Sequence, residues 1–391
     1  MSKMLIDVGS TYFKVCNDGD ISHHFRNFDK DIYDDLLFKC GDEIQKHQKD
    51  EIQICSSANG GLSTLIIGLT ESFSLKYASN IAYNSGINII ETVVYSQIES
   101  YSVPTDNLDV VIVVGGIDSV KNVFDETLIN YLDKLTYSNI VYVGSTTQVE
   151  FLEKNISNLV VLPNIIDNKL KMVEDDLKEY LTNLYQADIM GKEDIKRLYE
   201  LTSNQIYSTP YIVNQSLPLI HTKLDVADPF IVIDIGGATT DIHYSKDLVD
   251  DNIITTNEYD RLVFKKLGVY KSRESLVHTA KNNEFVYELL AHLNTTENML
   301  DSKDEKATKL LMQLSIFLVL YKISHHHKSY LNIKLDTLNS IVLTGGITKV
   351  LNNSEMEDII SFFYKKLLNF DTTPTLVVDK DYEIWTLGMS K

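Results

Sequence analysis

Two short stretches of the chain carry residue types suited to binding phosphate groups and a metal ion. The first spans residues 5–14 and contains an aspartate, a glycine, two hydroxyls and a lysine: Asp7, Gly9, Ser10, Thr11 and Lys14. The second spans residues 231–241 and repeats much of this pattern: Asp234, Gly236, Gly237, Thr239 and Thr240. In each stretch an apolar strand reaches an aspartate, and a glycine-containing turn then leads into a second strand. Two such hairpins predict two related half-sites that close on one ligand.

The ligand that suits these hairpins is ATP or ADP together with Mg²⁺. Glycines adopt positive φ and allow close backbone approach, so that consecutive N–H groups can point at a phosphate. The hydroxyls add hydrogen-bond donors, and Lys14 adds a positive charge. Asp7 and Asp234 are the candidate metal ligands and catalytic residues, because carboxylates hold Mg²⁺ directly or through water and can orient an attacking water.

A third element follows later in the chain, where the apolar run from Ser340 enters Gly345-Gly346. A strand that runs into two glycines lets a planar ring lie against the backbone, which suits adenine or ribose. The pair Gly115-Gly116 has the same form. The order hairpin, second hairpin, strand and glycine pair is that of the actin-like ATPase superfamily, which includes actin, sugar kinases and heat-shock chaperones. Gly345-Gly346 falls in that order, whereas Gly115-Gly116 does not.

The elements around these motifs predict an α/β protein. Apolar strands alternate with short helical segments between residues 50 and 165, which indicates a largely parallel sheet. Residues 168–223 have a helical pattern, and the polar, proline-containing segment 225–229 is the expected domain boundary. The superfamily resemblance implies a two-lobed actin-like fold of duplicated ribonuclease H-like domains with a nucleotide cleft between the lobes. We therefore expect an N-terminal lobe at 1–225, with its insertion at about 50–165 and a helical segment, and a C-terminal lobe at 226–391.

Composition excludes several classes of protein. With 391 residues, 44% hydrophobic and 23% charged, the chain has the composition of a globular protein with a full core. Its net charge of −19 argues against nucleic acid or an anionic membrane surface as a partner. The three cysteines, at positions 16, 40 and 55, have no metal-binding spacing. We expect no signal peptide, no apolar run of ~20 residues that could span a membrane, and a cytoplasmic location.

Within the superfamily, the chain resembles the MutL-type family associated with glutamate mutase. Several blocks carry the resemblance: residues 7–11 with Lys14, residues 56–62 with Gly68-Leu69, Gly115-Gly116 with Asp118 and Asn122, residues 162–164, Thr209-Pro210, and residues 233–243. Three positions depart from the family pattern as we expect it. Asn59 stands in place of an alanine, and Ser119-Val120 stand in place of further glycines.

This resemblance implies an ATP-driven reactivating factor, or chaperone, for an adenosylcobalamin-dependent mutase such as glutamate mutase. It places one group of residues on the phosphates and the metal: Asp7, Gly9, Ser10, Thr11, Gly236, Gly237, Thr239 and Thr240. It places Gly345 and Gly346 on the adenosine. The partner that it implies is the mutase, and a homodimer is left open.

Three other functions remain as alternatives. A small-molecule kinase of the same superfamily would need an acceptor-binding motif, and none stands out in the sequence. An activator of radical dehydratases would need cluster-binding cysteines in the C-terminal half, whereas every cysteine here lies at or before Cys55. A non-catalytic, actin-like filament or scaffold protein is the third alternative. The two intact aspartate-bearing hairpins argue against it without excluding it.

Overall fold

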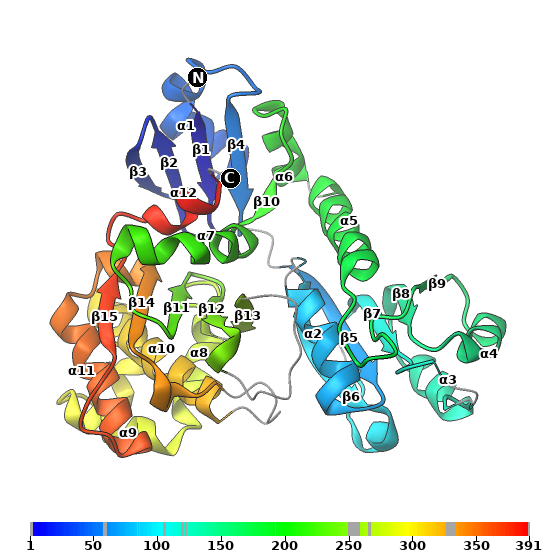
Figure 1. The fold of residues 1–391 in the computed structure, drawn as a ribbon. Helices are drawn as coiled ribbons and strands as arrows, with labels where there is room; N and C mark the ends of the chain where they lie inside the picture. The colour runs from blue at the N-terminus through cyan, green and yellow to red at the C-terminus, as the bar shows by residue number, and fades with distance from the viewer. Residues whose placement is uncertain are drawn as a thin grey trace. The chain divides into compact units, whose positions relative to one another are not determined.

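The computed structural model describes residues 3–57, 61–83, 85, 87–104, 107–118, 121, 123–191, 193–248, 259–264, 267–325 and 333–389. The chain divides into two compact units (Figure 1). The first comprises Met1–Gly60, Lys192–Leu248 and Arg261–Lys391, and the second comprises Gly61–Gly191 and Val249–Asp260. The predictions that concern Ala58–Gly60, Ser119, Val120 and Asn122 lie outside the described residues.

The first sheet of unit 1 has the strand order β10-β4-β1-β2-β3. Its strands are β1 (Met4–Val8), β2 (Tyr12–Asn17), β3 (Asp20–Phe25), β4 (Ile52–Ser56) and β10 (Tyr207–Ser208). β1 runs antiparallel to β2 and parallel to β4, and all five of its residues are buried. Its apolar run explains this central position, because both faces of a central strand are shielded from water.

The second sheet of unit 1 repeats this topology in the order β13-β12-β11-β14-β15. Its strands are β11 (Phe230–Ile235), β12 (Thr240–Ser245), β13 (Tyr259–Phe264), β14 (Ser340–Gly345) and β15 (Thr375–Val378). β11 is antiparallel to β12 and parallel to β14, as β1 is to β2 and β4. Two sheets with one strand order confirm the prediction of a duplicated, actin-like ATPase fold.

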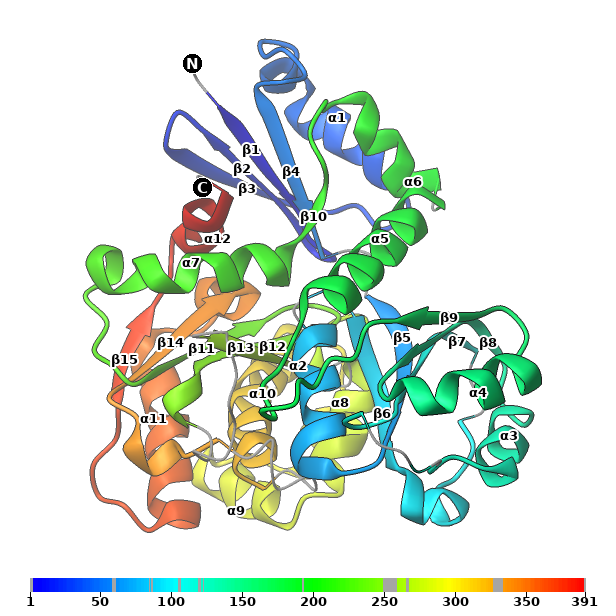
Figure 2. The same ribbon diagram turned by 45° about the vertical axis from the view of Figure 1, so that its right-hand side comes forward.

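Eight α-helices complete the described part of unit 1: α1 (Ile32–Ile44), α6 (Glu193–Lys196), α7 (Thr209–Leu224), α8 (Arg273–Lys281), α9 (Glu284–His292), α10 (Glu305–Ser324), α11 (Asn353–Phe363) and α12 (Glu383–Met389). α7 begins at Thr209-Pro210, and the Ser208 hydroxyl accepts a hydrogen bond from the Tyr211 amide. α7 and α12 pack against one another (Figures 1 and 2). A Cβ atom on Gly388 of α12 would lie 2.0 Å from the Ile212 carbonyl oxygen of α7.

Helix α10 is long and apolar enough to cross a membrane by length and composition alone. The sequence analysis expects no apolar stretch of this length. In the structure, 67% of its most apolar window is buried inside the protein, so α10 has the environment of a core helix.

Unit 2 is built on a five-stranded sheet in which every strand is parallel to its neighbour, in the order β6-β5-β7-β8-β9. Its strands are β5 (Leu62–Gly68), β6 (Ile87–Val94), β7 (Leu108–Val114), β8 (Tyr137–Val143) and β9 (Leu159–Leu162). Its helices are α2 (Lys76–Tyr83), α3 (Glu126–Leu132), α4 (Val149–Asn155) and α5 (Asp175–Gly191). The parallel sheet is as predicted from the alternation of strands and helices.

The boundaries of this unit differ from the expected insertion at about 50–165. Residues 52–56 form β4 and pair with β1 of the first sheet, whereas α5 extends unit 2 to Gly191. The expected helix at 168 also begins later, at Asp175. The Asp167 carboxylate accepts hydrogen bonds from the amides of Lys169 and Lys171 and fixes a tight turn there instead. The boundary at 225/226 between two lobes stays a prediction.

The contact between α7 and α12 predicts the effect of adding a single methyl group. Replacing Gly388 by Ala should lower the free energy of unfolding by about 1–3 kcal/mol, because the new Cβ atom meets backbone that cannot move aside. Urea unfolding of Gly388→Ala measures this. Gly41→Ala in α1 is the control, since its Cβ atom would meet only Leu37 at 4.0 Å, and it should be neutral or mildly stabilising. Equal stability of both variants would contradict the close packing of the two helices.

Candidate functional site

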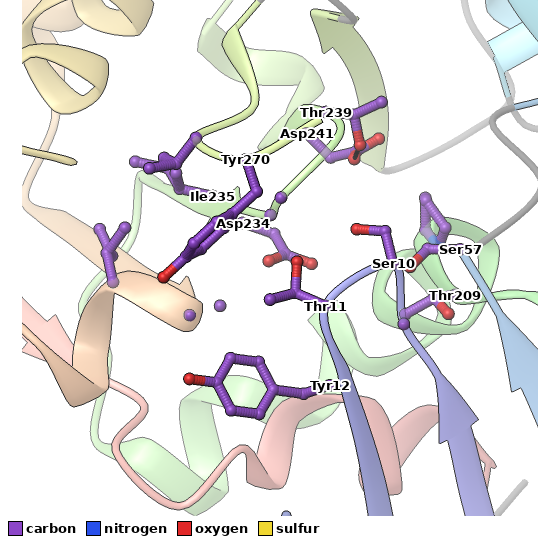
Figure 3. A pocket seen from close by; sticks show the side chains of 18 of the residues that line it. Ser10, Thr11, Tyr12, Ser57, Thr209, Asp234, Ile235, Thr239, Asp241 and Tyr270 are labelled. Atoms are coloured by element: carbon purple, nitrogen blue, oxygen red, sulfur yellow. Dashed lines mark hydrogen bonds between the residues drawn. The ribbon is translucent and has the colours of Figure 1, made fainter. Parts of the chain in front are cut away.

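A pocket in unit 1 lies between the two hairpins and the glycine pair after β14 (Figure 3). It encloses about 680 Å³ of space, part of which is open to solvent. Ten of the twelve predicted site residues line it: Gly9, Ser10, Thr11, Lys14, Asp234, Gly236, Gly237, Thr239, Gly345 and Gly346. Asp7 and Thr240 do not line it. The structure thus brings together residues that lie up to 337 positions apart in the sequence (346 − 9).

The two glycine turns have the same internal hydrogen bond. The Gly9 amide donates to the Tyr12 carbonyl at 3.0 Å, and the Gly236 amide donates to the Thr239 carbonyl at 2.9 Å. The turns also approach each other closely, since a Cβ atom on Gly237 would lie 2.0 Å from Thr11 Oγ1. Only glycine permits this approach. The hydroxyl of Thr11 is buried and forms no hydrogen bond with any described residue, so it can still donate to a ligand.

Asp7 lies behind the pocket wall with both carboxylate oxygens engaged. Lys14 Nζ donates to Oδ2 at 2.9 Å, and Thr209 Oγ1 donates to Oδ1 at 2.6 Å. Its side chain is 1% exposed. That Asp7 contacts the metal stays a prediction. In this structure Lys14 of the same hairpin and Thr209 occupy its two carboxylate oxygens.

Lys14 connects the two halves of the site electrostatically. Burial by itself lowers the pKa of Lys14, but the negative charges of Asp7 and Asp234 outweigh this, so the pKa lies above its ordinary value. The ammonium group therefore stays charged over the physiological range. It lines the pocket and also lies 4.8 Å from the centre of the Tyr382 ring.

Asp234 occupies the position in the second hairpin that Asp7 has in the first, but the charge of the residue across from it is negative instead of positive. In the register of β11 and β12 it lies across from Asp241, where Asp7 lies across from Lys14. No described residue donates a hydrogen bond to its half-buried carboxylate, which faces the pocket (Figure 3). Burial, with Asp241 and other nearby carboxylates, raises the pKa of Asp234 to about 7, although Lys14 opposes this. Asp234 is thus the free carboxylate of the site.

The structure corrects the role predicted for the Thr240 hydroxyl. Thr240 is buried, and its hydroxyl donates to the Leu267 carbonyl at 3.0 Å, so it does not reach the pocket. The strand alternation turns this side chain inward. The next residue, Asp241, lines the pocket instead and accepts a hydrogen bond from Thr239 at 3.0 Å.

The pocket has a polar end and an apolar end. In Figure 3, Ser10, Ser57 and Thr209 lie on one side, whereas Ile235 and Tyr270 lie on the opposite side. Val269, Met312 and Ile347 also line the pocket and add apolar surface. Sequence reasoning did not assign Ser57, Tyr270 or Met312 to the site. Tyr270 and Met312 come from segments without a motif, whereas Ser57 and Thr209 lie in blocks that resemble the family.

Comparison with known proteins gives one family. The sequence model described as "MutL protein" matches residues 4–389. Protein MutL from Clostridium tetanomorphum is 22% identical over 265 residues, which cover 61% of this chain and 57% of that protein. The chain therefore spans little more than half the length of this curated relative.

Solved structures with a related arrangement include three proteins of different function. Nucleotide-free acetone carboxylase is 12% identical, with a TM-score of 0.39. The match covers 99% of this chain and 70% of the acetone carboxylase chain. The ROK hexokinase from Thermus thermophilus is 8% identical, with coverage of 99% and 96% and a TM-score of 0.29. An archaeal actin homologue in complex with ADP is 14% identical, with coverage of 64% and 69% and a TM-score of 0.25. The fold assignment itself rests on the repeated strand order.

The pair of Asp7 and Lys14 predicts an asymmetric response to mutation. Lys14→Met should lower the free energy of unfolding by about 3 kcal/mol, because it leaves a buried carboxylate without its counter-charge. The double variant Asp7→Asn with Lys14→Met should lose clearly less, since no buried charge remains. Urea unfolding of both variants at pH 7 tests this. A double variant that is less stable than Lys14→Met would show that the two residues do not act as a pair.

The raised pKa of Asp234 predicts a stability that depends on pH. Between about pH 4 and 7 the unfolded chain has released this proton while the native protein retains it, so stability falls as the pH rises through this window. Asp234→Asn removes this loss. The variant should match the natural protein near pH 4 and exceed it by about 4 kcal/mol at pH 8, because each unit of pKa shift corresponds to about 1.4 kcal/mol.

Thermal unfolding across this pH range is the measurement. Asp371→Asn serves as the control, because Asp371 is an exposed aspartate far along the chain from the site. A difference between Asp234→Asn and the natural protein that stays constant from pH 4 to 8 would refute the raised pKa.

Proposed function

The chain belongs to the MutL protein family, and we propose that it binds ATP with Mg²⁺ in the pocket between its two hairpins and hydrolyses it. The observation that carries this proposal is the polarity of the pocket. One end offers backbone amides, hydroxyls and a lysine, whereas the other offers apolar side chains and exposed glycine backbone. A nucleotide polyphosphate likewise has charged phosphates at one end and a flat, largely apolar base at the other.

The phosphates would lie at the hairpin end. Gly9, Gly236 and Gly237 line the pocket with backbone alone, and Ser10, Thr11 and Thr239 add hydroxyl donors. Lys14 supplies a positive charge that is maintained by the carboxylates around it. In a protein with a net charge of −19, such a local arrangement is what an anionic ligand requires.

The base would lie at the opposite end, against Gly345 and Gly346. Tyr270, Met312 and Ile347 provide the apolar walls there. A Cβ atom on Gly345 would come within 2.5 Å of Asp234 Oδ1, so this glycine also allows the strand end to approach the carboxylate. Flat aromatic and apolar surfaces suit a purine ring.

The residues present fit Mg²⁺ at Asp234. Its carboxylate faces the pocket without a described hydrogen-bond donor, and carboxylates are ligands that Mg²⁺ prefers. Among the described residues, no group of three or more metal-ligating side chains occurs, so phosphates and water would provide the remaining ligands. When bound, the ion would neutralise charge on the phosphates during transfer.

Asp234 is also the candidate for orienting the attacking water. Its carboxylate faces the pocket, where it can accept a hydrogen bond from that water. Asp7 would act indirectly, because it holds Lys14 and Thr209 in place beside the pocket.

The substrate of this ATPase cycle is proposed to be a partner protein. Membership of the MutL family, together with the resemblance to proteins associated with glutamate mutase, supports a reactivating factor for an adenosylcobalamin-dependent mutase. ATP binding and hydrolysis would drive a conformational change that remodels the mutase and releases damaged cofactor. We propose a cytoplasmic location and leave the stoichiometry, including a homodimer, to experiment.

Nucleotide binding is tested by titrating the full chain with ATP and Mg²⁺ and by measuring phosphate release. Asp234→Ala should lose Mg²⁺-dependent turnover by 100-fold or more while it keeps its fold, as judged by circular dichroism. Asp358→Asn should retain turnover. Tyr270→Ala should weaken ATP binding but not the binding of inorganic tripolyphosphate. Full activity of Asp234→Ala would show that the site lies elsewhere.

The partner is tested with glutamate mutase inactivated by damaged cofactor. The natural protein with ATP and Mg²⁺ should restore mutase activity when fresh adenosylcobalamin is added, and Asp234→Ala should not. A panel of sugars and short acids is assayed in parallel. Phosphorylation of one of these acceptors, with no effect on the mutase, would replace the reactivating role by that of a small-molecule kinase.

A further inference from the structure

A second pocket of unit 1 lies beside β10, at the contact between α7 and α12 (Figure 2 shows these elements). It encloses about 760 Å³ of space, part of which is open to solvent. Its lining residues come from β4, the segment around β10, α7 and α12: Gln53, Asn204, Gln205, Tyr207, Tyr211, Ile212, Gln215, Gly388 and Met389. None of them lines the nucleotide pocket.

The lining of this pocket is polar but uncharged. Gln53, Gln205 and Gln215 present carboxamides that form no hydrogen bond with any described residue. Asn204 is fixed in place, because its Nδ2 atom donates to the Ile52 carbonyl at 2.8 Å. Tyr207 and Tyr211 stack with their ring centres 5.7 Å apart. The pocket therefore combines free carboxamides with a flat aromatic wall.

The neighbouring strand β10 is at the edge of its sheet. It pairs with β4 on one side, and no described strand lies on its other side. Tyr207 in this strand is 37% exposed, whereas Ser208, its other residue, is 8% exposed, so the strand is accessible at Tyr207. The free edge of a strand offers backbone N–H and C=O groups to another extended chain.

We propose that this pocket binds an extended, uncharged peptide segment of a partner protein, which adds a strand beside β10. A carboxamide both donates and accepts hydrogen bonds, as a peptide group does, so the three glutamines complement a peptide backbone. The uncharged lining disfavours phosphates and carboxylates, which need cationic partners. The tyrosine pair provides apolar surface for one side chain of the peptide.

The position of α7 connects this pocket with the nucleotide pocket. Thr209 and Pro210 line the nucleotide pocket, whereas Tyr211, Ile212 and Gln215 of the next turns line the second one. Thr209 also holds Asp7 at 2.6 Å. A peptide that shifts the first turns of α7 thus changes the wall of the nucleotide pocket. This coupling rests on the proposed function, whereas binding of the peptide does not.

The direct test uses a phage-displayed library of random heptapeptides, selected against the full chain. Enriched peptides are synthesised, and their dissociation constants are measured by fluorescence anisotropy. Gln53→Ala and Gln215→Ala should each weaken binding about tenfold, because each removes side-chain hydrogen bonds to the peptide. Gln97→Ala, an exposed glutamine of unit 2, is the matched control and should bind normally.

A second readout identifies the mode of binding. N-methylation of successive peptide positions should weaken binding at one position and spare its two neighbours, because β10 has only two residues and every second N–H of an added strand faces the edge of the sheet. The proposal is overturned if no enriched peptide depends on Gln53 or Gln215, or if N-methylation shows no alternation.

Coupling is measured with the same peptides. The peptide should change the dissociation constant of ATP, and ATP should change that of the peptide by the same factor. Equal affinities with and without the other ligand would overturn the coupling. If the chain binds no ATP at all, the proposed function fails, whereas the peptide measurements still decide the second site.

Discussion

The buried Asp7 carboxylate is the group on which the arrangement of unit 1 depends. It lies in the central strand of the first sheet and binds Lys14 from the same hairpin and Thr209 from the start of α7. A carboxylate removed from water is stable only when its oxygens are paired, so these contacts fix the hairpin and the helix relative to the sheet. The same helix then packs on α12, where Gly388 contacts the backbone of α7.

The second hairpin repeats the fold of the first but not its charges. Where Asp7 faces Lys14, Asp234 faces Asp241, and burial beside like charges raises the pKa of Asp234 to about 7. Duplication therefore yields one carboxylate that stabilises the structure and one that is destabilised and free to act. This division agrees with the general observation that functional sites retain groups that cost stability.

Much of the fold could be predicted because its signals are local. The residue pattern of each hairpin is complete within about ten residues. The alternation of strands and helices in unit 2 indicates a parallel sheet. The structure departs from these expectations where a specific hydrogen bond or strand pairing, which the residue pattern does not show, decides the outcome. The strand at 52–56 joins the first sheet because it pairs with β1, and helix α5 begins late because Asp167 fixes a turn. Thr240 turns away from the pocket because Leu267 accepts its hydroxyl.

The sequence by itself determined the duplicated hairpins, the glycine pair after β14 and the family resemblance. These follow from residue types at fixed spacing, which local backbone geometry translates into turns and strands. Only the tertiary structure decided which aspartate is free. Asp7 is engaged because Lys14 lies across from it and because Thr209, 202 residues further along the chain, donates a hydrogen bond to it. Asp234 has no such partners among the described residues, and its burial raises its pKa. Charge pairing and desolvation act through space, so no pattern along the chain records them.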